Sequence, residues 1–99
     1  MPFENCSPRA FNTNTVQRNA PAASGVYGLS SAQEWIYIGE TDNIKASLLG
    51  HLAERDTLIA RRRPSGFTFE LSPSYNRTAR KDRLVVELSP ACEDHFEKR

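Results

Sequence analysis

The sequence predicts an α+β fold, a small antiparallel sheet flanked by helices. Two short runs of β-branched and aromatic residues, 25–29 and 34–39, are separated by a short turn-like segment. A third run, 66–71, alternates apolar and polar residues, and apolar residues recur at helical spacing before and after it. The order strand, strand, helix, strand, helix does not alternate strictly, so an antiparallel sheet is favoured over a parallel one.

Length and composition indicate one soluble domain. The chain has 99 residues, a hydrophobic fraction of 38% and a net charge of +1. No apolar run reaches membrane-spanning length, and the N-terminus lacks the pattern of a signal peptide, so we expect a cytoplasmic protein with no membrane partner. Cys6 and Cys92 lack the spacing of a metal site. The near-neutral charge supports nucleic-acid binding only weakly, although Lys and Arg concentrate after residue 54.

The N-terminal third predicts an arm followed by a hairpin. Residues 1–23 show no sustained period, so we expect an extended arm that packs the apolar side chains of Phe3, Phe11 and Val16 on the core. The runs 25–29 and 34–39 then form the two strands of the hairpin.

A helix is expected after the hairpin. Thr41 or Asp42 can cap it, because either side-chain oxygen can accept a backbone N–H of the first turn. Ile44, Leu48 and Leu52 form its buried stripe. The pattern either continues through 58–60 or begins a second helix there, and the pattern leaves both possibilities open.

The remaining elements follow from stop signals and periodicity. Pro64-Ser65-Gly66 ends the helical region and leads into the strand 66–71. Residues 72–76 predict a loop, and a second helix is expected to begin near Arg77 or Thr78 and to end at Ser89-Pro90. Its buried side chains are expected to be Leu84, Val85 and Leu88.

A short signature carries a resemblance to a known family. Gly25-Val26-Tyr27 is followed by Tyr37-Ile38-Gly39, and then by Asn43-Ile44, Leu48 and His51. This pattern resembles that of the GIY-YIG nuclease superfamily over residues 24–90. The resemblance implies a central three-stranded antiparallel sheet flanked by helices. It divides the chain into an N-terminal arm packing on the domain (1–23), a GIY-YIG-like domain (24–90) and a C-terminal tail (91–99).

The resemblance also implies a chemistry and the residues for it. Members hydrolyse a phosphodiester with one divalent metal ion, using two tyrosines, a helix arginine that stabilises charge on the phosphate, and a later glutamate that holds the metal. Tyr27 and Tyr37 match the tyrosines, and His51 matches a histidine that many members carry one turn beyond the arginine.

Two positions depart from the family pattern. The arginine position is Ser47, whose hydroxyl offers one neutral donor and no countercharge. The glutamate position is Lys81, whose ammonium repels a cation. Lys81 precedes Leu84, Val85 and Leu88 at i, i+3, i+4 and i+7, so it is expected on the inward face of the last helix.

Three functions remain open from these residues. The first is a catalytically degenerate GIY-YIG-like module that needs no cofactor and binds DNA or other nucleic acid weakly through Arg61, Arg62 and Arg63. The second is an active endonuclease using Mg²⁺ or Mn²⁺, with its carboxylate relocated to Asp82 or Glu87 and its cation supplied by 61–63 or by the last helix. The third is a protein-interaction module that uses the former cleft or the sheet edge.

Each candidate residue also has a purely structural interpretation. Tyr27 and Tyr37 can be packing residues of half-buried strands. The arginines 61–63 can be a solvated helix end, where cations complement the helix dipole. Trp35 can pack on the core or stack on a base, and we favour packing.

Overall fold

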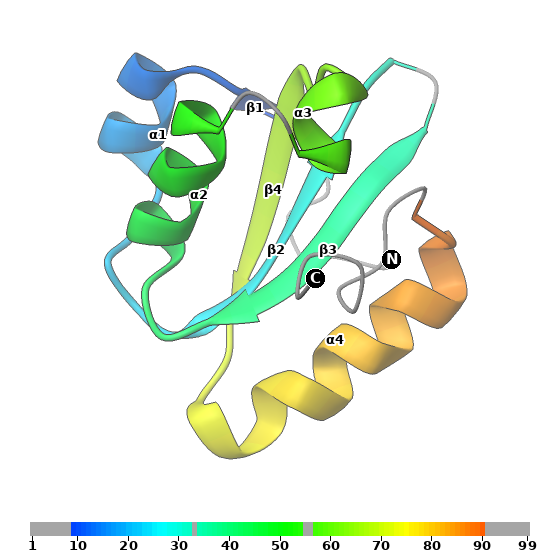
Figure 1. Cartoon of the computed structure of the whole chain (residues 1–99). Coiled ribbons are helices and arrows are strands. Elements are labelled where there is room, and N and C mark those ends of the chain that lie inside the picture. The colour runs from blue at the N-terminus through cyan, green and yellow to red at the C-terminus, as the bar shows by residue number, and fades with distance from the viewer. Residues whose placement is uncertain (1–8, 33, 55–56, 91–99) are drawn as a thin grey trace.

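The protein is a four-stranded antiparallel sheet covered by helices on both faces (Figure 1). The computed structural model describes residues 9–32, 34–54 and 57–90. Its elements, in chain order, are β1 Arg9–Ala10, α1 Thr13–Asn19, β2 Gly25–Ser30, β3 Trp35–Thr41, α2 Ile44–Ala53, α3 Leu58–Arg61, β4 Gly66–Leu71 and α4 Ser74–Leu88. No helix in these ranges is both long enough and apolar enough to cross a membrane.

The predicted hairpin and third strand are confirmed, and the sheet has one strand more than expected. Its order is β1-β4-β2-β3, with β2 antiparallel to both β3 and β4. The additional strand is β1, which pairs Arg9 with Phe67 and Ala10 with Gly66 at the start of β4. A strand of two residues carries no period, so the sequence pattern gave no sign of it.

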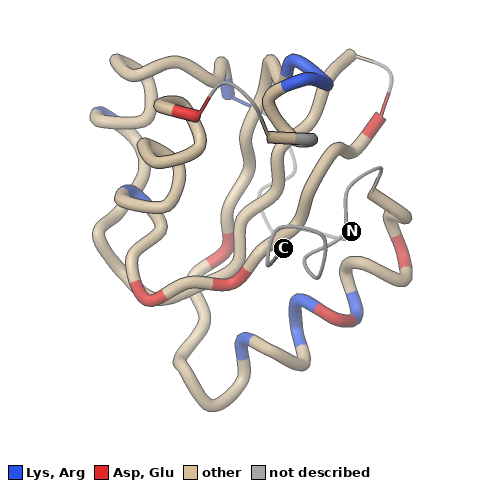
Figure 2. The backbone as a smooth tube through the Cα atoms, viewed as in Figure 1, with Lys and Arg blue, Asp and Glu red and all other residues tan. Residues whose placement is uncertain are grey.

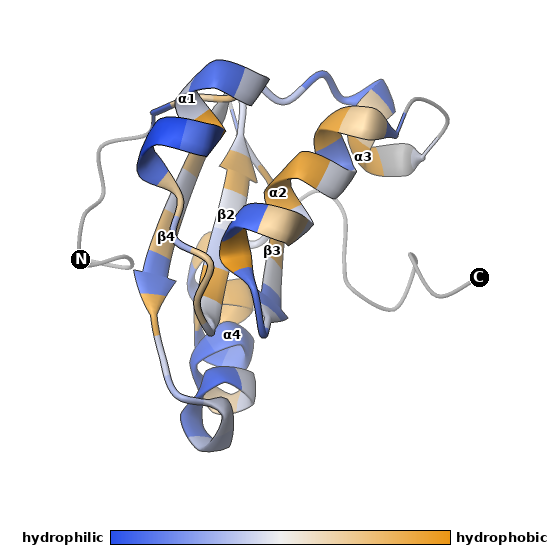
Figure 3. Ribbon diagram, turned by 90° about the vertical axis from the view of Figure 1, so that its left-hand side faces the viewer, coloured by the Kyte–Doolittle hydropathy of each residue, from blue (hydrophilic) through white to orange (hydrophobic). Residues whose placement is uncertain are grey.

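Two apolar clusters lie on opposite faces of the sheet. One contains Tyr27, Leu29 and Phe67 and is covered by α1, α2 and α3, and we call this side the tyrosine face. The other contains Val26 and Ile38 and is covered by α4 through Leu84. Figure 3 shows α2 and α4 on the two sides of the strands. Neighbouring residues such as Val26 and Tyr27 of β2 therefore meet different helices.

The prediction of an extended arm is wrong for residues 13–19, which form α1. The Asn12 side chain caps this helix by accepting the Thr15 N–H at 2.8 Å. Val16 is fully buried, and the ring of Phe11 meets that of Phe67 edge-on at 6.3 Å between centroids. The helix contains a single large apolar residue, so it lacks a detectable period. Phe3 and the tail 91–99 lie outside the described residues.

The predicted caps of α2 are wrong, because Asn43 caps it. The Asn43 Oδ1 accepts the Ala46 N–H at 3.0 Å. Thr41 Oγ1 instead accepts the N–H of Asn43 at 3.1 Å, which positions the capping residue. The helix ends at Ala53, and α3 is a separate short helix capped by Thr57. The Asn of the family-like signature therefore has a structural role.

The last helix begins earlier than predicted. It starts at Ser74 rather than near Arg77 or Thr78, because the Pro73 carbonyl accepts the N–H groups of Asn76 and Arg77 at 3.0 and 3.1 Å. Its predicted end is confirmed, since Ser89 adopts a left-handed conformation with φ of 48°.

Candidate functional site

Three of the residues selected from the sequence meet on the tyrosine face. Tyr27 from β2, Tyr37 from β3 and His51 from α2 have ring centroids 5.4 to 6.0 Å apart. The two tyrosines are only 4% and 5% exposed. We call these three residues the Tyr–His cluster. It lies where α2 crosses the hairpin, so the fold itself brings the three side chains together.

The glycines of the signature allow this approach. A Cβ on Gly39 would lie 2.8 Å from Tyr37 Cε2 and 2.9 Å from Tyr27 Oη, so any side chain would push the two rings apart. A Cβ on Gly25 would collide with the Glu70 carbonyl oxygen and would lie 2.7 Å from Ile44 Cδ1. Glycine is therefore needed at both positions because a side chain would have no room there, and not because the backbone angles are unusual.

A chain of hydrogen bonds runs through the cluster to a carboxylate. His51 Nε2 lies 2.8 Å from the Tyr27 hydroxyl, and His51 Nδ1 lies 3.3 Å from Glu54 Oε1. An ionised carboxylate only accepts, so Glu54 favours the tautomer with its proton on Nδ1. In that tautomer Nε2 accepts the Tyr27 hydroxyl proton, an arrangement suited to moving a proton off the phenol.

Glu54 was missed by the sequence analysis. It is the C-cap residue that follows α2, and it lies three positions after His51, one turn of helix away. That spacing was the available signal. The spacing points to Glu54 only when a carboxylate that could orient His51 is sought.

Ser47 lies on the same helix, one turn before His51. Its hydroxyl donates to Thr41 Oγ1 at 2.6 Å, so it is engaged within the protein at the end of β3. The position where the resemblance expects a guanidinium therefore holds a neutral group that already has an acceptor.

Lys81 comes from α4, which packs on the face opposite the Tyr–His cluster. Its side chain is 12% exposed, as its inward position predicts, and its ammonium lies 3.7 Å from Asp82 Oδ1. Asp82 is 68% exposed and Glu87 is exposed too, on the same helix.

The position where the resemblance expects the metal-holding glutamate bears no carboxylate. An ammonium stands where the resemblance expects a carboxylate, and Glu54, the carboxylate that reaches the cluster, is hydrogen-bonded to His51. Within residues 9–32, 34–54 and 57–90, no group of three or more His, Cys, Asp and Glu side chains could hold a metal ion.

Arg61, Arg62 and Arg63 form an exposed basic turn at the end of α3 (Figure 2). Arg62 pairs with Glu34 at 3.3 Å, and Arg63 adopts a left-handed backbone with φ of 56°. A pocket of about 160 Å³ beside this turn is lined by His51 and Glu54 together with Ala60 and Pro64, the residues that flank the three arginines. The basic turn therefore borders the Tyr–His cluster.

Two of the three arginines of α4, Arg77 and Arg80, have a different role. Glu40 and Glu70 flank Val26 across the sheet on the side that faces α4. Arg77 Nε donates to Glu40 Oε1 at 3.1 Å, and Arg80 donates to both oxygens of Glu70 at 2.6 and 2.8 Å. We call these two pairs the α4 clamp. They fasten the helix to the sheet.

The clamp also reaches the turn before α2. Arg77 contacts Asp42, and the hydrogen bond to Asp42 is the main reason that the pKa of Arg77 is raised. Trp35 packs, partly buried, against the cluster beneath α4, as expected.

Comparison with solved structures identifies the fold. The magnesium-bound GIY-YIG N-terminal endonuclease domain of UvrC from Thermotoga maritima superposes with a TM-score of 0.66. The match covers 78% of this chain and 93% of that domain at 17% identity. This chain has the GIY-YIG fold.

A cation-bound point mutant of the same UvrC domain gives a TM-score of 0.67, again at 17% identity, with 78% of this chain and 92% of that chain covered. No family model matches the sequence. No curated protein sequence matches it either. The GIY-YIG fold is thus shared with an endonuclease domain that is only 17% identical in sequence.

Proposed function

We propose that this GIY-YIG-fold domain binds nucleic acid with the basic turn and the neighbouring Tyr–His cluster, and does not hydrolyse it with a metal ion. The observation that carries the proposal is the shared pocket, lined by His51 and Glu54 on one side and by the residues flanking Arg61–Arg63 on the other. Exposed guanidinium groups bind phosphate oxygens, frequently with two hydrogen bonds each.

The absence of hydrolysis follows from charge. Ser47 supplies no cation to a phosphate in the transition state, and its hydroxyl already donates to Thr41. Removing one preorganised donor costs about 10²–10³-fold in rate in other enzymes. The ammonium of Lys81 adds a charge that opposes metal binding where the resemblance expects a carboxylate.

A second candidate is phosphodiester hydrolysis with Mg²⁺ or Mn²⁺, using Asp82 or Glu87 as the carboxylate. The hydrogen-bonded chain from Tyr27 through His51 to Glu54 favours it, because a decayed site has no need to keep a phenol and an imidazole aligned at 2.8 Å. Metal-dependent nicking of a plasmid would establish this candidate.

Binding is tested with labelled single-stranded and double-stranded oligonucleotides at several salt concentrations. For duplex DNA, the logarithm of the binding constant falls with the logarithm of the salt concentration, with a slope of about −0.9 for each phosphate that the protein neutralises. The variant Arg61→Gln/Arg63→Gln should therefore bind more weakly and with a shallower slope. Arg18→Gln, an exposed cation in the last turn of α1, serves as the control and should change neither. Equal losses in both variants, or no binding by the unmodified protein, would refute the proposal.

A further inference from the structure

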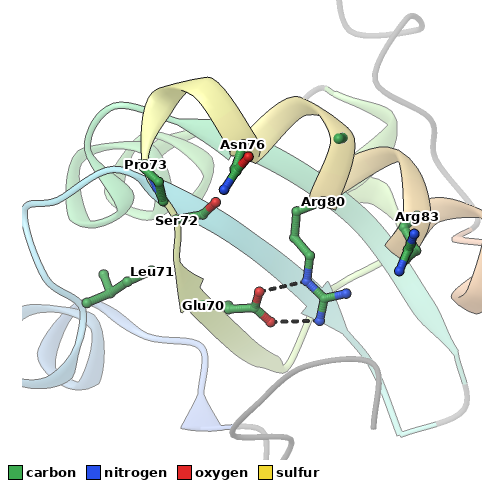
Figure 4. Close-up of a pocket in the computed structure, with 8 residues that line it drawn as sticks. Glu70, Leu71, Ser72, Pro73, Asn76, Arg80 and Arg83 are labelled. Carbon is green, nitrogen blue, oxygen red and sulfur yellow. Dashed lines mark hydrogen bonds and ion pairs between the residues drawn. The ribbon is translucent and has the colours of Figure 1, made fainter.

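We propose a second binding site, at the start of α4, for a phosphate-bearing ligand of mononucleotide size. The cavity has a volume of about 450 Å³ and lies between the end of β4 and one flank of α4 (Figure 4). It is lined by Glu70, Leu71, Ser72, Pro73, Asn76, Ala79, Arg80 and Arg83. A cavity of this size matches ligand pockets for small molecules.

The Ser72 hydroxyl is an available donor on the wall of the cavity. Ser72 is only 8% exposed and lines the cavity. Its backbone N–H donates to the Ser24 carbonyl and its own carbonyl accepts from Ser24 Oγ, but its hydroxyl has no hydrogen-bond partner in the described part of the chain. Its oxygen is not fully enclosed, since among the described residues Thr68 Oγ1 is the fully buried side-chain atom without a partner. The Ser72 hydroxyl is therefore reached from the cavity, where it can donate to a ligand oxygen.

The first turn of α4 supplies donors beside this hydroxyl. Pro73 occupies the cap position and no side chain caps the helix. The helix is 15 residues long, so its dipole adds positive potential at the same end of the cavity. The Asn76 side chain, drawn beside Ser72 in Figure 4, adds an amide donor.

Charge along the cavity favours an anion. Glu70 and Arg80 neutralise one another through two hydrogen bonds. Arg83, one turn further along α4, is exposed and makes no ion pair among the described residues, so the lining carries an uncompensated positive charge. Leu71, Pro73 and Ala79 provide apolar surface for the remainder of a ligand larger than phosphate.

This site is distinct from the proposed nucleic-acid surface. The basic turn precedes the start of β4, whereas the cavity lies at the other end of that strand and beside the helix on the opposite face. Failure of one proposal therefore leaves the other standing.

The test is calorimetry on the full chain with three probes: inorganic phosphate, a nucleoside monophosphate and the corresponding nucleoside. Both phosphate-bearing probes should bind, the nucleotide more tightly than phosphate, and the nucleoside should not bind. Binding of phosphate with no gain for the nucleotide means an anion site only and would refute the nucleotide-sized ligand. Binding of the nucleoside alone, or of none of the probes, would refute the site.

Two variants and a control locate the site. Ser72→Ala should raise the Kd by about 3- to 10-fold and Arg83→Gln by about 5- to 10-fold, since each removes a contact to the anion. Arg18→Gln should leave the Kd unchanged. Ser72→Ala removes a hydroxyl without a partner, so its thermal unfolding should match that of the unmodified protein and show that weaker binding does not come from impaired folding. Unchanged binding in both variants would overturn the assignment.

Discussion

The two faces of the sheet use polar side chains for opposite purposes. On the tyrosine face, Tyr27 and His51 form a hydrogen-bonded chain that ends beside a small pocket and an exposed basic turn. On the other face, Arg77 and Arg80 are bound to Glu40 and Glu70 and hold α4 against the sheet. Adjacent residues of one strand, Val26 and Tyr27, serve the two faces. The basic residues of this sequence therefore divide into a group that is bound within the fold and a group that is exposed, which a count of charges does not separate.

The largest expected effect comes from the core beneath α4. Leu84 is fully buried between the helix and the sheet. Leu84→Ala should lower the free energy of unfolding by about 2–5 kcal/mol, because apolar burial is reduced and a cavity is left behind. Urea denaturation measures this change. A value below about 1 kcal/mol would mean that α4 does not pack on the sheet as described and that the α4 clamp does not form.

A smaller loss of stability is expected when the clamp itself is broken. Glu70→Gln removes the charge that receives both hydrogen bonds from Arg80, and should cost about 1–3 kcal/mol. Glu87→Gln, an exposed carboxylate on the same helix, should change the unfolding free energy by less than about 0.5 kcal/mol. If the two substitutions changed the free energy of unfolding in urea equally, Glu70 would have no structural role.

The tyrosine face can be disturbed through a single methyl group. Gly39→Ala forces a Cβ against Tyr37 and Tyr27, and overpacking of this kind costs about 1–3 kcal/mol. Gly50→Ala is the matched control, because a Cβ on Gly50 of α2 meets no atom within 4 Å. It should instead stabilise the protein by about 0.5–1 kcal/mol. Thermal melts should show a lower melting temperature for Gly39→Ala and a higher one for Gly50→Ala. A change in the same direction for both variants would contradict the packing around Gly39.

The smallest energetic effect is expected at Glu54. Its pair with His51 is partly exposed, so Glu54→Ala should alter stability by less than about 1 kcal/mol. The tautomer of His51 should respond more clearly, because the carboxylate favours the proton on Nδ1. Nitrogen chemical shifts of the His51 ring report the tautomer directly. An unchanged tautomer in the variant would remove Glu54 from the hydrogen-bonded chain.

Much of the fold followed from the sequence because strong local patterns encode it. The strands expected at 25–29 and 34–39 from their β-branched and aromatic residues, and at 66–71 from alternation, form within one or two residues of those bounds. Of the predicted helical stripe, Ile44 and Leu48 are fully buried and Leu52 is partly buried. The elements that were missed, β1 and α1, are short and hold only one or two apolar residues. Their formation depends on a cap at Asn12 and on tertiary contacts that no local pattern reveals.

The candidate site was predictable where a motif carried it and not elsewhere. Tyr27, Tyr37 and His51 were selected by the signature and do come together. The partners of Arg77 and Arg80 depend on which strand lies beside which helix, and sequence spacing alone does not give that. Glu54 follows His51 by one helical turn, a spacing that many residue pairs share and that does not select it by itself.

A plasmid-nicking assay with Mg²⁺ or Mn²⁺ tests the central claim most directly, comparing the unmodified protein with Tyr27→Phe. This variant removes only the hydroxyl that bonds His51. We expect no cleavage above background by either protein, under low-salt conditions in which the unmodified protein binds the plasmid. Metal-dependent nicking that Tyr27→Phe abolishes would contradict it and establish a working nuclease.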